Sequence, residues 1–161
     1  MPNKNRQATP KSGAPAVSVS GQGGPLRRMT MKKERTYEGG CLCGNIRFSA
    51  KGPAQNPHTC SCKMCQNHSG SLTQVWVEFP SDVIKWNGPG GEPSKWRSSE
   101  FSSRSFCSTC GSTLGAIDDA PVIAIALGSF DAPNRKELKP LAHSYKSKRP
   151  KWWSVEIDDV H

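Results

Sequence analysis

The chain has 161 residues and a formal net charge of +9, and 34% of its residues are hydrophobic, which is enough for one domain with a core plus an additional polar segment. The longest apolar run, residues 122–127, is far shorter than the roughly 18 residues that a membrane-spanning helix needs. We therefore expect a soluble protein and exclude a helical membrane protein.

The N-terminal segment differs in composition from the rest. Residues 1–33 contain seven basic residues and no acidic one, and are otherwise rich in Gly, Pro, Ser, Ala and Asn. This composition predicts a disordered basic tail over residues 1–34, followed by one domain over residues 35–161. An organelle transit peptide, or a leader ahead of a start near Met29 or Met31, are alternative interpretations of the same segment.

The charge of the domain bears on its partners. After the tail, the chain contains 15 basic and 13 acidic residues, so the predicted domain is close to neutral. A nucleic-acid-binding domain needs a basic face of its own, so nucleic acid is expected to bind only through the tail. No secretory signal is recognisable, and we expect a cytoplasmic protein.

From Arg35 onward the apolar pattern alternates with the period of strands. It predicts strands at residues 45–50, 72–79, 83–86, 94–98, 102–106, 122–127 and 142–146, with Gly and Pro between them. Helical structure is expected only around residues 63–68 and near 135–138. The sequence therefore predicts an all-β or nearly all-β domain.

Seven cysteines fall into three tight groups: Cys41 and Cys43; Cys60, Cys62 and Cys65; Cys107 and Cys110. Ligands one or two residues apart can reach one tetrahedral metal ion, whereas a disulfide needs Cα atoms about 4.4–6.8 Å apart. An odd number of cysteines would also leave one thiol over in a set of disulfides. A redox C-x-x-C pair or inert buried thiols could explain one group, but three groups together indicate metal binding.

The positions of these groups relative to the strands can also be predicted. We expect Cys41 and Cys43 to open a strand after a turn at Gly39 and Gly40, and the middle group to occupy a loop of its own. Cys107 and Cys110 are expected in a knuckle-like turn before Gly111, where backbone N–H groups can contact the thiolates.

Seven ligands divide most simply into four and three. Cys41, Cys43, Cys107 and Cys110 would form a closed structural zinc site, and Cys60, Cys62 and Cys65 would hold a second zinc. A rival division joins Cys41 and Cys43 to Cys62 and Cys65. A third completes the second site with His58 or His68, which would give two closed structural sites.

A site with only three thiolates constrains the chemistry. Three sulfur anions leave a zinc centre with about one net negative charge, so it polarises carbonyls and acidifies water less well than a three-histidine site. A substrate thiol is a fourth soft ligand that such a site accepts well. The expected substrate is therefore a thiol.

Several motifs together resemble one known family. They are G-G-C-L-C-G-N-I-R-F at 39–48, C-S-C-K-M-C-Q-N-H-S-G-S at 60–71, W-R-S-S at 96–99, S-F-C-S-T-C-G-S-T-L at 105–114, L-G-S-F-D at 127–131 and H-x-x-K-x-x-x-x-x-W-W at 143–153. This combination, over about residues 35–159, is similar to the glutathione-dependent formaldehyde-activating enzyme family, also called the centromere protein V type.

The resemblance implies a fold and an activity. The fold would be a β-tent of mainly antiparallel sheets with two zinc ions, the structural one on Cys41, Cys43, Cys107 and Cys110 and the catalytic one on Cys60, Cys62 and Cys65. The implied activity is carbon-sulfur lyase chemistry, the reversible combination of glutathione with formaldehyde to S-hydroxymethylglutathione. The chain departs from many members in having Thr59 directly before Cys60, with His58 one position earlier. The alternative function is a non-enzymatic zinc-binding scaffold whose basic tail binds nucleic acid or an acidic partner.

Single residues can be weighed within this scheme. His68 is the candidate catalytic residue, as a carrier of the hydroxymethyl proton, with a solvated or backbone-bonded side chain as the alternative. Residues 69–71 are interpreted as a helix-ending turn rather than an oxyanion site. Arg104, Lys63 and Arg97 are candidates for binding substrate carboxylates. The five tryptophans are expected to pack in the core and against the sheets, with one lining the substrate pocket as the alternative: Trp76, Trp86, Trp96, Trp152 and Trp153.

Overall fold

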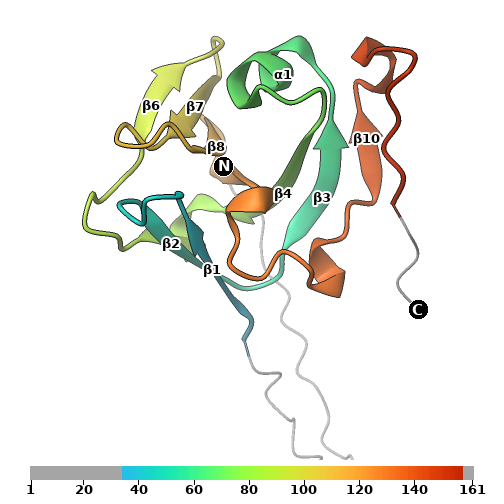
Figure 1. The fold of residues 1–161 in the computed structure, drawn as a ribbon. Coiled ribbons are helices and arrows are strands. Elements are labelled where there is room, and N and C mark those ends of the chain that lie inside the picture. Colours follow the sequence, from blue (N-terminus) through green and yellow to red (C-terminus); the bar gives the residue numbers. More distant parts are fainter. Residues whose placement is uncertain (1–33, 158–161) are drawn as a thin grey trace, which may run out of the picture. The chain divides into compact units, whose positions relative to one another are not determined.

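A computed structural model describes residues 34–157; most of the predicted tail therefore lies outside the described residues (Figure 1). The strands in this part are β1 (Thr36–Gly40), β2 (Arg47–Lys51), β3 (Gln55–Cys60), β4 (Gln74–Pro80), β5 (Ile84–Trp86), β6 (Ser94–Arg97), β7 (Ser102–Phe106), β8 (Thr113–Asp118), β9 (Val122–Ala126) and β10 (Ala142–Ser144). The helical elements are α1 (Lys63–Ser69) and the 3-10 turns η1 (Ser81–Val83), η2 (Leu127–Ser129), η3 (Lys136–Leu138) and η4 (Lys146–Lys148).

The strands form two sheets. The smaller has the order β1-β2-β5 and the larger the order β10-β3-β4-β9-β8-β7-β6. Every pairing is antiparallel except that of β10 with β3, which is parallel. The prediction of an all-β domain with mainly antiparallel sheets is confirmed.

One hydrophobic core joins the two sheets. Val77 and Phe79 on β4 alternate with Trp76 and Glu78, and Val77 and Phe79 are fully buried. They belong to one cluster with Ile123 and Ile125 of β9 and with Tyr37, Phe48 and Ala50 of the smaller sheet. Phe130 lies among these rings, with its centroid 5.2 Å from that of Phe48 and 6.2 Å from that of Phe79. The Phe48 and Phe130 rings meet edge to face at 80°, and this preferred ring geometry favours one arrangement of the sheets.

The alternate residues of the same strands build a second cluster. Trp76 of β4, Ala116 of β8 and Ala126 of β9 pack with Cys60 and Cys65, and Ala124 is partly buried against them. Because side chains alternate between the two faces of a strand, this cluster lies on the opposite face of the larger sheet from Val77 and Ile125. The small alanine side chains leave room for the cysteines beside Trp76.

Most of the predicted elements are confirmed, with bounds that differ by at most two residues. The helical segments expected at 63–68 and near 135–138 are α1 and η3. The predictions missed β1, β3 and β8. Pro57 and a register shift between Gln55 and His58 interrupt β3, and Gly115 interrupts the apolar pattern of β8. No Cβ fits at Gly115, since it would lie 2.8 Å from the carbonyl oxygen of Ala124.

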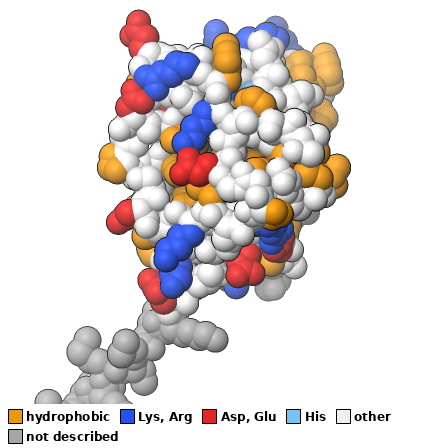
Figure 2. All heavy atoms as spheres, turned by 90° about the vertical axis from the view of Figure 1, so that its left-hand side faces the viewer, with side chains coloured by type: hydrophobic (Ala, Val, Ile, Leu, Met, Phe, Trp, Pro, Cys, Tyr) orange, Lys and Arg blue, Asp and Glu red, His pale blue; other side chains and the backbone are white. Residues whose placement is uncertain are grey.

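The prediction for the tryptophans is largely wrong. Trp76 is buried and Trp86 is half-buried, but Trp96, Trp152 and Trp153 are 65%, 78% and 36% exposed. On the face shown in Figure 2, basic and acidic side chains are interspersed. Within residues 34–157, no helix is both long enough and apolar enough to cross a membrane.

Candidate metal centres and the cavities beside them

The sulfur atoms of Cys41, Cys43, Cys107 and Cys110 lie within 4.8 Å of one another. The Sγ of Cys43 is 3.5 Å from that of Cys41 and 3.8 Å from that of Cys107. Four sulfurs about 2.3 Å from a tetrahedral zinc are themselves about 3.8 Å apart. The donor set and its spacing therefore fit a four-thiolate metal site.

Two similar turns bring these four cysteines together. In the first, the amide of Cys41 donates to the carbonyl of Ile46 and Gly44 adopts φ 77°. In the second, the amide of Cys107 donates to the carbonyl of Ser112 and Gly111 adopts φ 74°. A positive φ favours glycine, which explains the glycine in each turn. Two hydrogen bonds join the turns. The amide of Leu42 donates to Ser112 Oγ (3.0 Å), and Asn45 Nδ2 donates to Thr109 Oγ1 (3.2 Å).

The expected position of the first pair is wrong. Gly39 and Gly40 end β1 instead of forming a turn, and Cys41 and Cys43 lie in the turn before β2. The knuckle predicted for Cys107 and Cys110 is confirmed, because both lie in the turn between β7 and β8. The Sγ of Cys41 accepts a hydrogen bond from the amide of Ile46 (3.2 Å), which spreads thiolate charge into the backbone.

A hydroxyl also acts on this cluster. Ser112 Oγ lies 3.1 Å from the Sγ of Cys110, and this hydrogen bond lowers the pKa of Cys110 to about 5. Since Ser112 Oγ already accepts from the amide of Leu42, its own hydrogen is free to point at the sulfur. The turn thus favours Cys110 as a thiolate, the form that binds metal.

The sulfur atoms of Cys60, Cys62 and Cys65 form a second group within 4.8 Å of one another. Cys60 ends β3, Cys62 is the N-cap of α1 and Cys65 lies inside α1. The prediction that these three occupy a loop of their own is therefore wrong; they occupy a strand-to-helix junction. The Sγ of Cys62 accepts from the amide of Cys65 at 3.4 Å, so one ligand also caps the helix.

Hydrogen bonding within the group shifts the pKa values of Cys60 and Cys65 in opposite directions. It lowers the pKa of Cys60, to about 5, through Cys65, and it raises the pKa of Cys65, with burial adding to the rise. Closely spaced thiolates repel one another, so the last protons are hard to remove unless a cation offsets their charge. Soft anionic sulfur donors fit zinc, and the three residues could hold one metal ion.

The two groups follow the four-plus-three division. The rival set of Cys41 and Cys43 with Cys62 and Cys65 does not come together. Among the described residues, the ligand atoms of neither His58 nor His68 belong to the group of three. His58 Nδ1 instead lies 2.8 Å from the carbonyl oxygen of Asn56.

A cavity of about 280 Å³ lies over the group of three; we call it the cysteine cavity. Cys60, Cys62 and Cys65 line it together with residues of β3, β4, β7, β8 and β9, of α1 and of the segment after β10, among them His58, Met64, Trp76, Glu78, Arg104, Asp118 and Tyr145. Tyr145 has φ 55°, an uncommon conformation for a residue other than glycine. A strained residue of this kind is often found at a functional site.

His68 lies in a neighbouring cavity of about 570 Å³, which we call the tryptophan cavity. Its other lining residues are Met64, Asn67, Trp96, Ser98, Arg104 and Phe106. His68 Nε2 is buried and has no hydrogen-bond partner. Burial, and then the charge of Arg104, lower the pKa of His68, so its imidazole is neutral at pH 7.

The three basic candidates have different surroundings. Arg97 donates to both carboxylate oxygens of Asp119 at 2.6 Å, so its guanidinium already has a carboxylate partner. Lys63 is exposed on α1 and lines neither cavity. Arg104 lines both cavities.

The turn predicted at residues 69–71 is confirmed. Gly70 is the C-cap of α1 with φ 70°, and its amide donates to the carbonyl of Gln66 at 2.9 Å. The amide of Ser71 donates to Ser69 Oγ. Both N–H groups donate to acceptors in the last turn of α1 and so are not available to an oxyanion.

A polar network that the sequence reasoning missed supports the group of three. Ser61, between Cys60 and Cys62, is fully buried, and its Oγ lies 2.8 Å from Thr73 Oγ1 and 2.9 Å from His143 Nε2. Trp153 Nε1 donates to the same Thr73 Oγ1 at 3.1 Å. The histidine and the second tryptophan of the motif at 143–153 therefore act on the segment that carries the cysteines.

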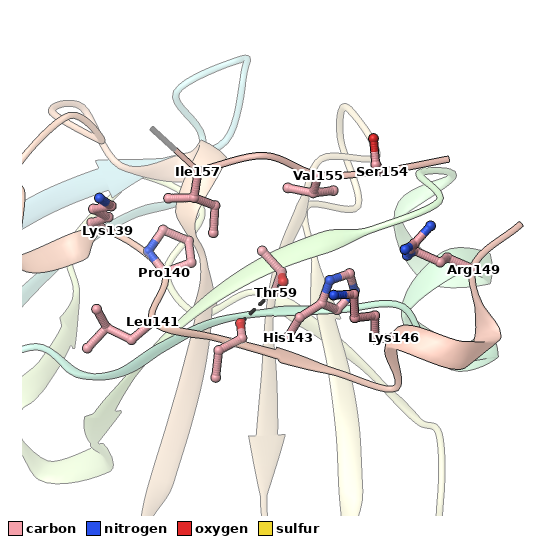
Figure 3. Close-up of a pocket in the computed structure, with 11 residues that line it drawn as sticks. Thr59, Lys139, Pro140, Leu141, His143, Lys146, Arg149, Ser154, Val155 and Ile157 are labelled. Carbon is pink, nitrogen blue, oxygen red and sulfur yellow. Dashed lines mark hydrogen bonds between the residues drawn. The ribbon is translucent and has the colours of Figure 1, made fainter. Parts of the chain in front are cut away.

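A further cavity, of about 480 Å³, lies between β10 and the segment at 154–157 (Figure 3). Figure 3 shows Thr59, His143, Lys146 and Arg149 along it, with Leu141 and Pro140 toward its other end. Thr59 and Cys60 are adjacent in β3, so their side chains point to opposite faces of the sheet. This cavity is therefore separated from the cysteine cavity by β3.

These features define a class: a two-sheet β domain that carries one closed set of four cysteines and one set of three beside a cavity. The chain belongs to the glutathione-dependent formaldehyde-activating enzyme (GFA) family, whose sequence profile matches residues 36–148. An uncharacterized lyase of Schizosaccharomyces pombe is 32% identical over 78 residues, which is 48% of this chain and 55% of that protein. The chain thus spans about half the length of this relative.

The fold also occurs in a solved structure. The crystal structure of a Rhodobacter sphaeroides protein matches with a TM-score of 0.51 at 12% identity, over 66% of this chain and 99% of that one. At this level of identity the match shows the fold alone. The relative is named as a lyase, and the family is named for a glutathione-dependent formaldehyde-activating enzyme.

Proposed function

We propose that the protein is a zinc-dependent carbon-sulfur lyase that reversibly joins a glutathione-like thiol to a small carbonyl compound, as in S-hydroxymethylglutathione formation and cleavage. The observation that carries this proposal is the contrast between the two cysteine sets. One has four sulfurs, the full number for a tetrahedral site, whereas the other has three, and all three of its cysteines line one cavity. A structural role alone gives no reason for an incomplete set to face a cavity.

The chain offers residues for both metals. Cys41, Cys43, Cys107 and Cys110 would hold a structural zinc between the end of β1 and the β7–β8 turn. Cys60, Cys62 and Cys65 would hold a second zinc, which when bound supplies a position where a thiol is stabilised as a thiolate.

The reaction requires no oxidant or reductant. In the forward direction a sulfur-carbon bond forms, the carbonyl π bond breaks, and the proton lost by the thiol ends on the former carbonyl oxygen. In the reverse direction the sulfur-carbon bond breaks, the carbonyl π bond forms again, and the hydroxyl proton returns to the sulfur. The protein must therefore bind the two reactants next to each other and move one proton.

Two residues are proposed for these tasks. Arg104 is the candidate for a substrate carboxylate, because it lines the cysteine cavity and none of the ion pairs among residues 34–157 includes it. His68, in the adjoining tryptophan cavity, is the proposed proton carrier, since its Nε2 is buried without a partner and its lowered pKa keeps the ring in the neutral form that can act as a base.

Metal content measured with and without glutathione tests the proposal. We expect two zinc ions per chain, and one per chain in Cys62→Ser, with the fold retained as judged by circular dichroism. In the cobalt-substituted protein, glutathione should change the absorption spectrum of the wild type and leave that of Cys62→Ser unchanged. Exchange between glutathione, formaldehyde and their adduct, followed by NMR, should be faster with wild type than with the variant.

Either of two results would contradict the proposal. One is two zinc ions that respond to no thiol, which would favour a structural role for both. The other is an exchange rate that equals the rate without protein, because the condensation then proceeds unaided.

A further inference from the structure

The cysteine cavity and the tryptophan cavity adjoin, and the side chains of Met64 and Arg104 line both. Met64 comes from α1 and Arg104 from β7, and Arg104 Nη2 lies 2.9 Å from Met64 Sδ. Figure 1 shows α1 next to the β6–β7 hairpin, the two elements that enclose the tryptophan cavity. One flexible side-chain contact therefore separates the cysteines from a second and larger space.

The size and lining of the tryptophan cavity do not suit a one-carbon carbonyl. Its volume is about 570 Å³, whereas a molecule of the size of water occupies roughly 30 Å³ in the liquid. Met64, Trp96 and Phe106 give it apolar walls, and Trp96 is 65% exposed although tryptophan gains free energy from burial. An apolar cavity with a few polar groups is typical of a small-molecule site.

The polar groups of this cavity lack suitable partners. Arg104 donates to a thioether, a weak acceptor, and through Nη1 to Ser102 Oγ at 3.3 Å, while its Nε is buried without a partner. His68 Nε2 on the same cavity is also buried and unpartnered. Buried polar atoms without partners are costly, and since a guanidinium can only donate, the unpartnered Nε of Arg104 points to a ligand that supplies oxygen atoms.

The electrostatic surroundings select the ligand's charge. Arg104 has its guanidinium carbon 6.0 Å from the centroid of the Trp76 ring, and no carboxylate pairs with it within residues 34–157. A guanidinium binds a carboxylate through two parallel hydrogen bonds and prefers it to a neutral acceptor.

We propose that the tryptophan cavity binds an aromatic carboxylate group of the substrate, with the ring between Trp96 and Phe106 and the carboxylate on Arg104. This inference rests on the proposed function in one respect: the reacting end of the same substrate occupies the cysteine cavity. The physiological substrate is then larger and more apolar than the adduct of glutathione and formaldehyde. Arg104 and Trp96 are its specificity-determining residues.

Phenylacetate is a suitable probe, because it contains the ring and the carboxylate and has no thiol. Binding to the zinc-loaded protein would be followed by NMR of the Trp96 indole N–H and by tryptophan fluorescence. We expect saturable binding of phenylacetate, binding of its neutral isostere phenylacetamide at least tenfold weaker, and no measurable binding of acetate.

Variants assign the binding to the named side chains. Arg104→Gln should lower the affinity for phenylacetate at least tenfold and leave the affinity for phenylacetamide unchanged. Trp96→Ala should lower the affinity for both compounds. The matched controls are Arg97→Gln on the same hairpin and Trp152→Ala on the exposed C-terminal segment, neither of which should change binding. Arg104→Lys keeps the charge and should weaken phenylacetate less than Arg104→Gln, which provides a second test if the glutamine variant does not fold.

Three results would overturn the inference: no saturable binding of phenylacetate, equal affinity for the acid and the amide, or unchanged affinity in both Arg104 variants. Failure of the proposed function has a different signature. In that case glutathione leaves the cobalt spectrum unchanged and the exchange rate stays at its value without protein, whereas phenylacetate still binds.

Discussion

Oγ of Ser61 lies 2.9 Å from Nε2 of His143, and this contact joins the segment between Cys60 and Cys62 to strand β10. The backbone repeats the connection, because the amide of Ser61 donates to the carbonyl of Ser144 at 3.0 Å. β10 is paired in parallel at the edge of the larger sheet, with only three residues in the pairing. A short edge strand is thus fixed by side chains that also fix the orientation of the cysteines.

Removing the Ser61 hydroxyl tests this connection. Ser61 is fully buried, so Ser61→Ala leaves His143 Nε2 and Thr73 Oγ1 with fewer partners. We expect the free energy of unfolding to fall by about 1–3 kcal/mol. Urea denaturation measures this loss, and a competition titration with a chromophoric chelator should show weaker zinc binding at one of the two sites. Ser81→Ala, at an exposed position at the start of η1, is the control and should change neither quantity.

Gly39 is predicted to tolerate no side chain. A Cβ there would lie 2.2 Å from the carbonyl oxygen of Ser129 and 2.6 Å from the ring of Phe48, where β1 meets Phe130. Gly39→Ala should therefore lower the free energy of unfolding by about 1–3 kcal/mol, the usual range for overpacking. Gly128→Ala is the control, since its Cβ would meet no atom within 4 Å. Equal midpoints of the two variants in urea would contradict this prediction.

Local patterns in this chain could be predicted from the sequence, whereas contacts between residues far apart in the chain could not. The alternation along β4 and β9 and the spacing of the cysteines are local, so the strands and the four-plus-three grouping could be predicted. The Ser61–His143 and Arg104–Met64 contacts join residues 82 and 40 positions apart, and no periodicity marks them. β3 was missed for a related reason: a strand with Pro57 and a register shift is stabilised by β4 and β10 rather than by its own sequence.

The pH dependence of stability should carry a contribution from His68. In the folded state burial, and after it the charge of Arg104, lowers the pKa of His68, whereas its pKa in the unfolded chain is about 6.5. Above the unfolded value both states are neutral and His68 contributes nothing. As the pH falls below it, the unfolded chain takes up a proton first, so stability falls until the folded pKa is reached.

His68→Gln measures this contribution. The free energy of unfolding of the wild type should decrease more steeply than that of the variant between pH 7 and pH 5. Protonation of the cysteines affects both proteins, so the difference between the two curves isolates His68. Parallel curves would show that the His68 pKa is the same in the folded and unfolded states.

Arg97 is predicted to be dispensable for substrate binding. Its two bonds to Asp119 lie at the surface, with 48% and 61% of the two side chains exposed, and exposed ion pairs contribute little to stability. Arg97→Ala should therefore leave the rate of adduct exchange and the affinity for glutathione unchanged and shift the urea midpoint only slightly. A loss of glutathione affinity comparable to that of Arg104→Ala would reverse the roles assigned to the two arginines.

The two cysteine sets are predicted to differ in what their loss does to the fold. Cys107 is fully buried in a small cluster with Cys41, Ile46 and Leu114, between turns that close on each other. Structural zinc contributes about 10–16 kcal/mol to the folding of small zinc domains, so Cys107→Ser should unfold the domain or lower its free energy of unfolding by several kcal/mol. Cys62 is only half-buried and caps one end of α1, so Cys62→Ser should lose its zinc and keep the sheets. Circular dichroism and zinc content of both variants, with Cys43→Ser as an exposed member of the set of four, separate the two effects. If Cys62→Ser unfolds as completely as Cys107→Ser, the set of three also has a structural role and the division of labour between the two sites is wrong.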